Sequence, residues 1–277
     1  MPVGRHRTMT GSFVKQKALA GGLTVAQPEK LTKEFIEELR AMKPEFFVVA
    51  GYGKIFPKSL LEIPSIGSYN IHLSLLPKYR GASPVQEALL HGDTITGNTI
   101  IKMTEAMDAG PMVWAEEVEI TPEDTMVTVN EKLARSAARN IVEVLIRIAK
   151  GEVTELAQDE KEATFCHKIC KEDGSVEWSI VSAHEVVNQI RAFTPWPSCF
   201  TYWNGKLLKL LSATISNTTT DIKPAEMVIE NNQLLIGTAK GALMPQQLQL
   251  EGKSPTSVRD FINGNAAMIK AHPLLTE

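Results

Sequence analysis

Polar and apolar residues alternate strictly between residues 69 and 74, a pattern typical of a β-strand. The apolar members are Tyr69, Ile71 and Leu73, and the polar members are Asn70, His72 and Ser74. Side chains on a strand point alternately to its two faces, so Asn70 and His72 are expected on the same face. Pro77 and Gly81 then end regular structure. We predict a strand that presents an amide and an imidazole side by side.

Helices and further strands flank this strand. Apolar runs predict strands at residues 23–26, 46–50, 99–103 and 111–120, the second of them buried on both faces. Helices are predicted at 13–20, 32–42 and about 124–150, and another is expected to start at Ser83 with a capping box completed by Gln86. The long helix has an apolar face of Val129, Leu133, Ala137, Ile141, Val144, Leu145 and Ile148. The pattern predicts an α/β domain with a Rossmann-like, mainly parallel sheet and ligand groups at strand ends.

The pattern changes after residue 150. Residues 151–170 are polar and predict a linker, which separates a catalytic domain at 1–150 from a second domain at 171–277. A helix is expected at 182–193, and short strands at 207–215, 227–230, 233–238 and 243–250 are separated by hairpin-like turns. With a last helix at 256–264, this spacing predicts a small β-barrel. Phe193 and Trp196 are expected in the core.

Composition limits the class of protein. The chain has 277 residues, 43% hydrophobic and 22% charged, with no apolar run as long as a membrane span and no signal-peptide pattern, so a cytoplasmic protein is expected. Three cysteines are too few for a disulfide framework. Cys166, His167 and Cys170 have a spacing compatible with metal ligands, but no second ligand pair lies nearby and no metal site is expected.

Charge is distributed unevenly along the chain. The net charge of -3 argues against generic nucleic-acid binding. The first acidic residue is nevertheless Glu29, and five basic residues precede it: Arg5, His6, Arg7, Lys15 and Lys17. This basic segment is either a surface for a phosphate backbone or a solvated charged loop.

Candidate chemistry centres on Asn70, His72 and Asp108. An asparagine amide can donate to a developing oxyanion, and a histidine can move a proton near neutral pH. Asp108 follows the strand predicted at 99–103, and a carboxylate commonly orients such a histidine. Taken alone, each residue is better explained as a loop or strand-end residue that satisfies backbone groups. Their joint spacing favours an active site.

Asn70-x-His72, residues 74–81 and Asp108 resemble the signature of the formyltransferases that use 10-formyltetrahydrofolate. The resemblance implies that these three polar residues are catalytic. It also implies that the loop Ser74, Leu75, Leu76 and Pro77 wraps the folate, and that the pterin lies against the backbone of Tyr52, Gly53, Lys54 and Ile55. Without the resemblance, Tyr52 and Gly53 are equally explained as a strand-end turn. The signature does not choose the acceptor, because sugar, purine-precursor and aminoacyl-tRNA formyltransferases share it.

Three segments of the second half make the resemblance more specific. Residues 168–174, 191–197 and 247–261 look like the methionyl-tRNA formyltransferase family, although the middle one also occurs in sugar formyltransferases. The resemblance implies formyl transfer to the α-amine of initiator methionyl-tRNA by a monomer without membrane contact or metal. It also implies a C-terminal OB-like barrel that helps hold tRNA. Our candidates for tRNA contact are Arg5, Arg7, Lys15, Lys206 and Lys209.

Two alternatives remain open. One is a formyltransferase acting on a small amine such as an amino-sugar nucleotide, and the other is a tRNA-binding remnant without activity. Family members begin with a βα unit ahead of a basic loop that residues 2–7 resemble. On the order of 30–40 residues are therefore expected to be absent here, with strand edges and apolar surface exposed and activity lost if this is the whole protein.

Overall fold

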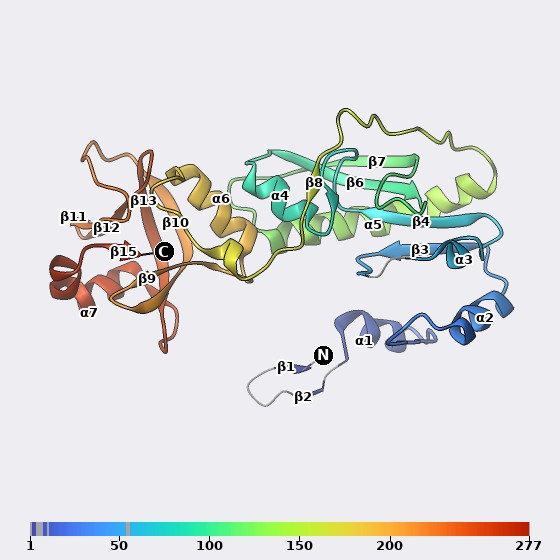
Figure 1. Ribbon diagram of the computed structural model, residues 1–277, viewed down its shortest axis with the longest axis horizontal. Helices are drawn as coiled ribbons and strands as arrows, with labels where there is room; N and C mark the ends of the chain where they lie inside the picture. Colours follow the sequence, from blue (N-terminus) through green and yellow to red (C-terminus); the bar gives the residue numbers. More distant parts are fainter. Residues whose placement is uncertain (1, 4–7, 10, 54–55, 277) are drawn as a thin grey trace.

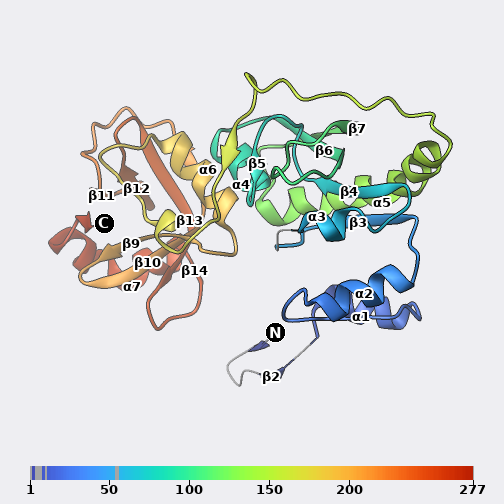
Figure 2. The same ribbon diagram turned by 45° about the vertical axis from the view of Figure 1, so that its right-hand side comes forward.

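The computed structural model describes residues 2–3, 8–9, 11–53 and 56–276. Figures 1 and 2 show an α/β part and a mostly antiparallel β part, joined by a long extended segment that follows α5. The short strands β1 (Pro2–Val3) and β2 (Thr8–Met9) pair with each other near the N-terminus. The first two helices follow them, to one side of the main sheet in both views.

The central sheet of the α/β part has the order β3-β4-β6-β7. Its strands are β3 (Phe46–Ala50), β4 (Gly67–His72), β6 (Ile95–Lys102) and β7 (Met112–Glu119). β3 and β4 are parallel, whereas β4–β6 and β6–β7 are antiparallel. The sequence predicted a mainly parallel sheet, and the described strands form a mixed one. The loop at residues 103–111 is short enough to join antiparallel neighbours, which the strand pattern alone did not reveal.

β3 is an edge strand. It was predicted to be buried on both faces, and this is wrong: Val48 is 44% exposed and only Val49 is buried. In the described part of the chain, its one strand partner is β4. The helix α2 (Lys33–Ala41) starts at its predicted cap, Thr32, and α1 (Phe13–Ala20) starts after Ser12, but neither helix buries any of its residues. The strand predicted at 23–26 does not form.

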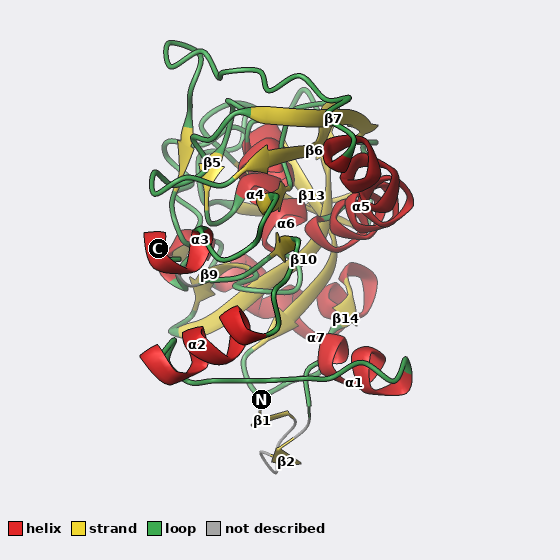
Figure 3. Ribbon diagram, turned by 90° about the vertical axis from the view of Figure 1, so that its right-hand side faces the viewer, coloured by secondary structure: helices red, strands yellow, loops and turns green. Residues whose placement is uncertain are grey.

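The long helix α5 (Met126–Ala149) covers one face of this sheet (Figure 3). Its predicted apolar face is confirmed. Val144 is buried against Tyr69 of β4 and Ile100 of β6, with Ile141, Leu145 and Ile148 packed around them. Val129 and Leu133, nearer the start of α5, join a second core with helix α4 (Pro84–Leu90). One face of the sheet is therefore closed by α5, and the polar side chains of β4 lie on the other.

The helix α4 starts at the predicted residue, but its predicted capping hydrogen bonds do not form. Ser83 is its N-cap and Pro84 its first residue, but Ser83 makes no capping hydrogen bond. Its hydroxyl donates instead to the carbonyl oxygen of His167, and its N–H faces the Sγ of Cys166 at 3.3 Å. Ser83 therefore attaches α4 to the segment after residue 150. A capping box read from local sequence could not include a partner so distant in the chain.

The second sheet is antiparallel and lies in the C-terminal part. Its path is β11-β12-β13-β10-β9-β15, with β14 beside β13. Its strands are β9 (Cys199–Trp203), β10 (Lys206–Ser216), β11 (Met227–Glu230), β12 (Gln233–Gly237), β13 (Ala242–Leu250), β14 (Thr256–Ser257) and β15 (Leu275–Thr276). A bridge between Glu226 and Leu274 brings the two ends of this path together. The sheet therefore closes on itself, as the prediction of a barrel required.

Helices α6 (Ala183–Phe193) and α7 (Val258–Ala271) pack on this barrel core. α6 starts with a capping box between Ser182 and Glu185. β9 was not predicted, and α7 runs beyond the predicted end at 264. Phe193 is buried as expected, but Trp196 is 55% exposed, so that prediction is wrong. Trp196 lies in the loop after α6, between two prolines, and points away from the core that Phe193 enters.

Four short elements complete the described structure. They are α3 (Lys58–Leu61), β5 (Arg80–Gly81), β8 (Phe165–Cys166) and a 3₁₀ turn (Glu172–Gly174). β8 belongs to the segment predicted as a linker and pairs in parallel with β5. The segment therefore returns to the α/β part before it enters the barrel (Figure 1).

Candidate active site

The three predicted polar residues converge at the end of β4. Asn70 donates from Nδ2 to the Oδ1 of Asp108 at 3.3 Å. A carboxylate oxygen only accepts hydrogen bonds here, so the NH₂ of Asn70, not its oxygen, faces Asp108. The second carboxylate oxygen of Asp108, Oδ2, accepts from the backbone N–H of Gly81 at 3.0 Å. Asn70 keeps a second amide hydrogen for another acceptor.

His72 lies behind Asp108. Its Nδ1 is 3.7 Å from the Oδ2 of Asp108, and its Nε2 is 2.8 Å from the carbonyl oxygen of Tyr79. Because a carbonyl only accepts, Nε2 carries a hydrogen. The nitrogen that faces Asp108 is therefore Nδ1. His72 is only 5% exposed, so a molecule in solution reaches Asp108 before it reaches His72.

The backbone around Asp108 is tightly constrained. Asp108 itself has a φ of 52°, a left-handed conformation that aspartate tolerates better than most residues. A Cβ at Gly110 would overlap the carbonyl oxygen of Lys102, and a Cβ at Gly81 would overlap that of Cys166. Both positions therefore require glycine, which explains why each flanks the site.

A cavity of about 410 Å³ opens beside Asn70 and Asp108. Gly51, Tyr52 and Gly53 from the end of β3 line one side of it, and residues 103–108 line another. The predicted neighbours Tyr52 and Gly53 are therefore brought to the site. Lys54 and Ile55, which were predicted with them, lie outside the described residues. The size and the mostly apolar walls suit a small heteroaromatic ligand.

The loop predicted to wrap the folate does not line this cavity. Leu75 and Pro77 line a separate cavity that also includes Asp93 and Thr96. Ser74 is fully buried and donates from Oγ to the carbonyl oxygen of Lys78 at 2.6 Å. The N–H of Leu76 donates to Thr99 Oγ1 at 3.0 Å, which ties the loop to β6. In this structure the Ser74–Pro77 segment is fixed by hydrogen bonds to Lys78 and to β6 and is not part of the cavity beside Asn70.

The residues predicted to contact tRNA are dispersed. Lys15 lies on α1, and Lys206 and Lys209 lie on β10. Arg5 and Arg7 lie outside the described residues. Within residues 11–53 and 56–276, the three lysines form no ion pair within 4.0 Å.

Sequence reasoning missed three contributors. Arg80 is 2% exposed and lies beside Gly81. Gln158 donates to the backbone of the Asp108 loop from the segment predicted to be a surface linker. Phe56 and residues 103–107 complete the cavity wall. Arg80 lies within the signature at residues 74–81, but no role was predicted for it, because these roles depend on contacts between distant segments.

The groups beneath the site are held neutral by burial. Burial raises the pKa of the Tyr79 hydroxyl, and its hydrogen bond to Asp93 at 2.8 Å raises it further. Burial also raises the pKa of the Cys166 thiol, although the N–H of Ser83 opposes this shift. A buried thiol of this kind is a poor nucleophile, so Cys166 contributes packing rather than reactivity.

The spacing of Cys166, His167 and Cys170 does not produce a metal cluster. No group of three or more histidine, cysteine or acidic side chains within the described ranges is arranged to hold a metal ion. His167 instead lies 3.2 Å from Asp173, which also accepts from the N–H of Cys170 at 2.7 Å. Searched over the same residues, the chain contains no helix with the length and apolar character needed to cross a membrane.

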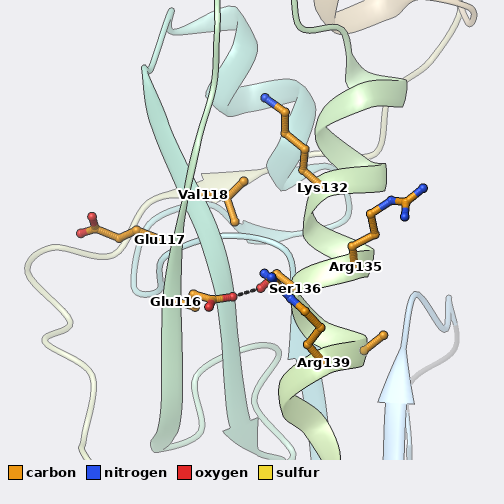
Figure 4. A pocket seen from close by; sticks show the side chains of 8 residues that line it. Glu116, Glu117, Val118, Lys132, Arg135, Ser136 and Arg139 are labelled. Carbon is orange, nitrogen blue, oxygen red and sulfur yellow. Dashed lines mark hydrogen bonds between the residues drawn. The ribbon is translucent and has the colours of Figure 1, made fainter.

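A larger cavity, of about 700 Å³, lies between β7 and α5 (Figure 4). Its polar residues bind one another: Ser136 donates to Glu116, and Asn140 donates to the same carboxylate at 3.3 Å. Lys132 at its rim pairs with Asp124. This cavity contains none of the predicted catalytic residues, so we place the site at the smaller one.

Comparison with known proteins gives matches along nearly the whole chain. Residues 3–145 match the family profile "Formyl transferase", and residues 168–266 match "Formyl transferase, C-terminal domain". The chain is 40% identical to a methionyl-tRNA formyltransferase of Koribacter versatilis, over 95% of this chain and 84% of that protein. It is 38% identical to one of Marinobacter nauticus, over 97% and 86% respectively.

Solved structures share the fold. A methionyl-tRNA formyltransferase from Clostridium thermocellum matches with a TM-score of 0.59 and 17% identity, over 76% of this chain and 92% of that one. HypX from Aquifex aeolicus, in complex with tetrahydrofolic acid, matches with a TM-score of 0.61 and 17% identity, over 86% and 41%. Two matched domains and relatives at about 40% identity along nearly the whole chain lead to one conclusion: this chain belongs to the formyl transferase family.

Proposed function

We propose that this protein transfers a formyl group from 10-formyltetrahydrofolate to the α-amine of methionyl-tRNA, which gives the N-formylmethionyl-tRNA used to initiate translation. The observation that carries the proposal is the cluster of Asn70, Asp108 and His72 at the edge of a 410 Å³ cavity. It occurs in a chain whose relatives, at 34–40% identity, are named methionyl-tRNA formyltransferases.

The cavity suits the pterin part of the folate. It is bounded by glycines at positions 51 and 53, whose missing side chains leave backbone groups accessible, and by the rings of Tyr52 and Phe56. Backbone N–H and C=O groups beside apolar walls are the usual means of orienting a flat heterocycle. When bound there, the folate supplies the formyl carbon that the amine attacks.

Asn70 is proposed to stabilise the charge that develops during the attack. Its Nδ2 is already oriented by Asp108, and its second hydrogen is available to the formyl oxygen. A donor fixed before the reaction stabilises a developing oxyanion without further reorganisation. Such donors typically contribute 10²–10³ in rate.

Asp108 and His72 are proposed to move the proton. The attacking amine must lose a proton. Of Asp108 and His72, only Asp108 lines the cavity. Asp108 accepts this proton and passes it to Nδ1 of His72, 3.7 Å behind it. The hydrogen bond from Nε2 to Tyr79 keeps the ring in the orientation that points Nδ1 forward. The bond between the formyl carbon and the folate nitrogen then breaks, and the return of the proton to that nitrogen completes the transfer.

The acceptor is inferred from the relatives and from charge. Lys206 and Lys209 on β10, together with Lys15 and the basic segment that includes Arg5 and Arg7, are proposed to contact the tRNA. Contacts between lysine or arginine and phosphate weaken steeply as salt rises. A steep salt dependence of tRNA binding that charge reversal at Lys206 and Lys209 reduces would support this assignment.

Formyl transfer from 10-formyltetrahydrofolate should be measured with methionyl-tRNA and, separately, with an amino-sugar nucleotide. The protein should be compared with His72→Ala and with the control His184→Ala, which removes an exposed imidazole from α6. We expect transfer to methionyl-tRNA that only His72→Ala abolishes. Transfer to the sugar alone would favour the small-amine alternative. Tight tRNA binding without transfer would favour the inactive remnant.

A further inference from the structure

Gln158 joins the extended segment after α5 to the loop that carries Asp108. Its Nε2 donates to the carbonyl oxygen of Asp108 at 2.8 Å and to that of Gly110 at 2.8 Å. The side chain therefore uses both amide hydrogens on the backbone immediately around the carboxylate. Gln158 is half-buried, and it approaches this loop from a segment about fifty residues further along the chain.

Arg80 fixes the orientation of this amide. It donates from Nε and Nη2 to the Oε1 of Gln158 at 3.0 and 2.8 Å. Because a guanidinium only donates, the oxygen of Gln158 must face Arg80 and its NH₂ must face the loop. Arg80 is itself held by Glu160, which accepts from Nη1 and Nη2 at 2.9 Å each. Arg80 thus orients Gln158 through two hydrogen bonds that converge on the same oxygen.

The loop needs such support because its backbone is constrained. Asp108 has a φ of 52°, and such left-handed conformations cost free energy in residues other than glycine. The only described side chains that hydrogen-bond to the Asp108 carboxylate or to its backbone oxygen are those of Asn70 and Gln158. Asn70 is itself a candidate catalytic group, so Gln158 is the one of the two with a purely supporting position.

We propose that Gln158 is a positioning residue, which holds Asp108 at the distance from Asn70 and His72 that proton transfer requires. The inference rests on the proposed formyl transfer for its catalytic consequence, but its structural part concerns only the Asp108 loop. The same segment also holds the opposite side of the site, because Thr164 Oγ1 accepts from the N–H of Tyr79 at 2.8 Å. The segment predicted to be a linker thus positions catalytic groups from both sides.

The decisive variant is Gln158→Glu. It keeps an oxygen for Arg80 but has no hydrogens for the two loop carbonyls. Gln158→Met fills a similar volume without any hydrogen bond and without a new charge near Asp108, so it serves as a second variant. Asp159→Asn is the matched control, because Asp159 is the exposed neighbour of Gln158 and accepts from the N–H of Lys161 rather than from Arg80.

We expect kcat for formyl transfer to fall about 10–100-fold in both Gln158 variants, while KM for both substrates stays within about twofold, because misplacement of a catalytic group by about 1 Å has effects of this size. The second readout is hydrogen exchange of the Gly81 amide, which donates to Asp108. Exchange should accelerate at Gly81 in both variants. Asp159→Asn should change neither quantity.

The outcomes separate the possible roles. Unchanged kcat and unchanged Gly81 exchange in the Gln158 variants would overturn the proposal. A fall in kcat that is matched in Asp159→Asn, together with a general loss of stability, would show that Gln158 is only structural. If the unmodified protein transfers no formyl group, the proposed function fails. Faster Gly81 exchange in the variants would even then support the positioning of Asp108 by Gln158, and unchanged exchange would contradict it.

Discussion

Gly81 and Asp108 hold the active site together through one hydrogen bond, in which the Gly81 N–H donates to the Asp108 Oδ2 at 3.0 Å. Gly81 has a φ of 123°, a value that side chains disfavour. Its Cα faces the carbonyl oxygen of Cys166 in β8, without room for a Cβ. The donor can reach Asp108 only because β5 and β8 lie this close.

Gly81→Ala should therefore destabilise the protein by about 2–4 kcal/mol, since it combines an unfavourable φ with a clash against backbone. Activity should fall as well, because separation of β5 from β8 moves the N–H away from Asp108. Urea unfolding and kcat measure the two effects. The matched control is Gly264→Ala in α7, where a Cβ meets nothing within 4 Å. There, alanine should be neutral or stabilise by up to about 1 kcal/mol.

Asp108→Asn tests the carboxylate itself. The change keeps the shape of the side chain and removes its ability to accept a proton, so kcat should fall by about 10²–10⁴ with little change in stability. Because the variant adds an NH₂ group beside the donors of Asn70 and Gly81, a modest loss of loop order is also expected. Initial rates with saturating folate and methionyl-tRNA measure the effect. A variant that keeps more than about a tenth of the activity would exclude Asp108 from proton transfer.

The sequence predicted the three polar residues of the site because they stand in a strand alternation and a nearby loop. Asn70 and His72 share a face of β4, and period-2 alternation alone required this. Gln158 and Arg80 could not be found in this way. Their partners are 48–80 residues away, and hydrogen bonds between distant segments leave no local pattern. The same reason explains Ser83, whose predicted capping role was replaced by a contact with His167.

The fold, like the site, was predictable where a local pattern determines the structure and was not predictable where distant segments determine it. Helices with strong caps and an apolar stripe, such as α5, were predicted almost to the residue. Strand direction was not, because a strand pattern does not say which neighbour the strand meets. Burial also depended on neighbours: β3 has the apolar sequence of a central strand but lies at the edge of the described sheet. Trp196 likewise has the composition of a core residue, but the turn that contains it faces solvent.

Arg191 provides a third prediction, which concerns the junction between the two parts. Its Nη1 donates to the carbonyl oxygen of Thr121 at 3.1 Å, and its Nη2 donates to Asn188 at 2.7 Å. Burial lowers the pKa of the guanidinium, although Asp124 and Glu123 oppose this shift. Arg191→Lys removes the planar fork and should destabilise the junction by about 1–3 kcal/mol.

Loss of protection from hydrogen exchange at the start of α5 and along α6 would show that this junction has opened. The control is Arg259→Lys, on an exposed position of α7 far along the chain from the junction. That variant should leave exchange in both segments unchanged. Equal effects from the two variants would mean that Arg191 has no special role at the junction.

Asp124 provides the last prediction, a dependence of stability on pH. Burial opposes its charge, but hydrogen bonds from Lys132, Thr121 and Thr128 outweigh burial and lower its pKa from 3.8 to about 2. A carboxylate with a lowered pKa stabilises the folded state above its unfolded pKa, and this stabilisation is lost as pH falls through the folded pKa. Asp124 should therefore contribute about 2 kcal/mol at pH 7, and this contribution should disappear between about pH 4 and pH 2.

Asp124→Asn removes that contribution, so the variant should be about 2 kcal/mol less stable at pH 7 and the difference should shrink as pH falls below 4. Urea titrations at pH 7, 5 and 3 measure the free energy of unfolding in each case. The control is Glu123→Gln. Glu123 is the exposed neighbour of Asp124 and accepts none of the hydrogen bonds that hold the start of α5. A difference between Asp124→Asn and the unmodified protein that stays constant across this range would show that the charge of Asp124 is not what stabilises α5. In that case, the second acceptor oxygen of Asp124, which an asparagine lacks, would be what fixes the helix start.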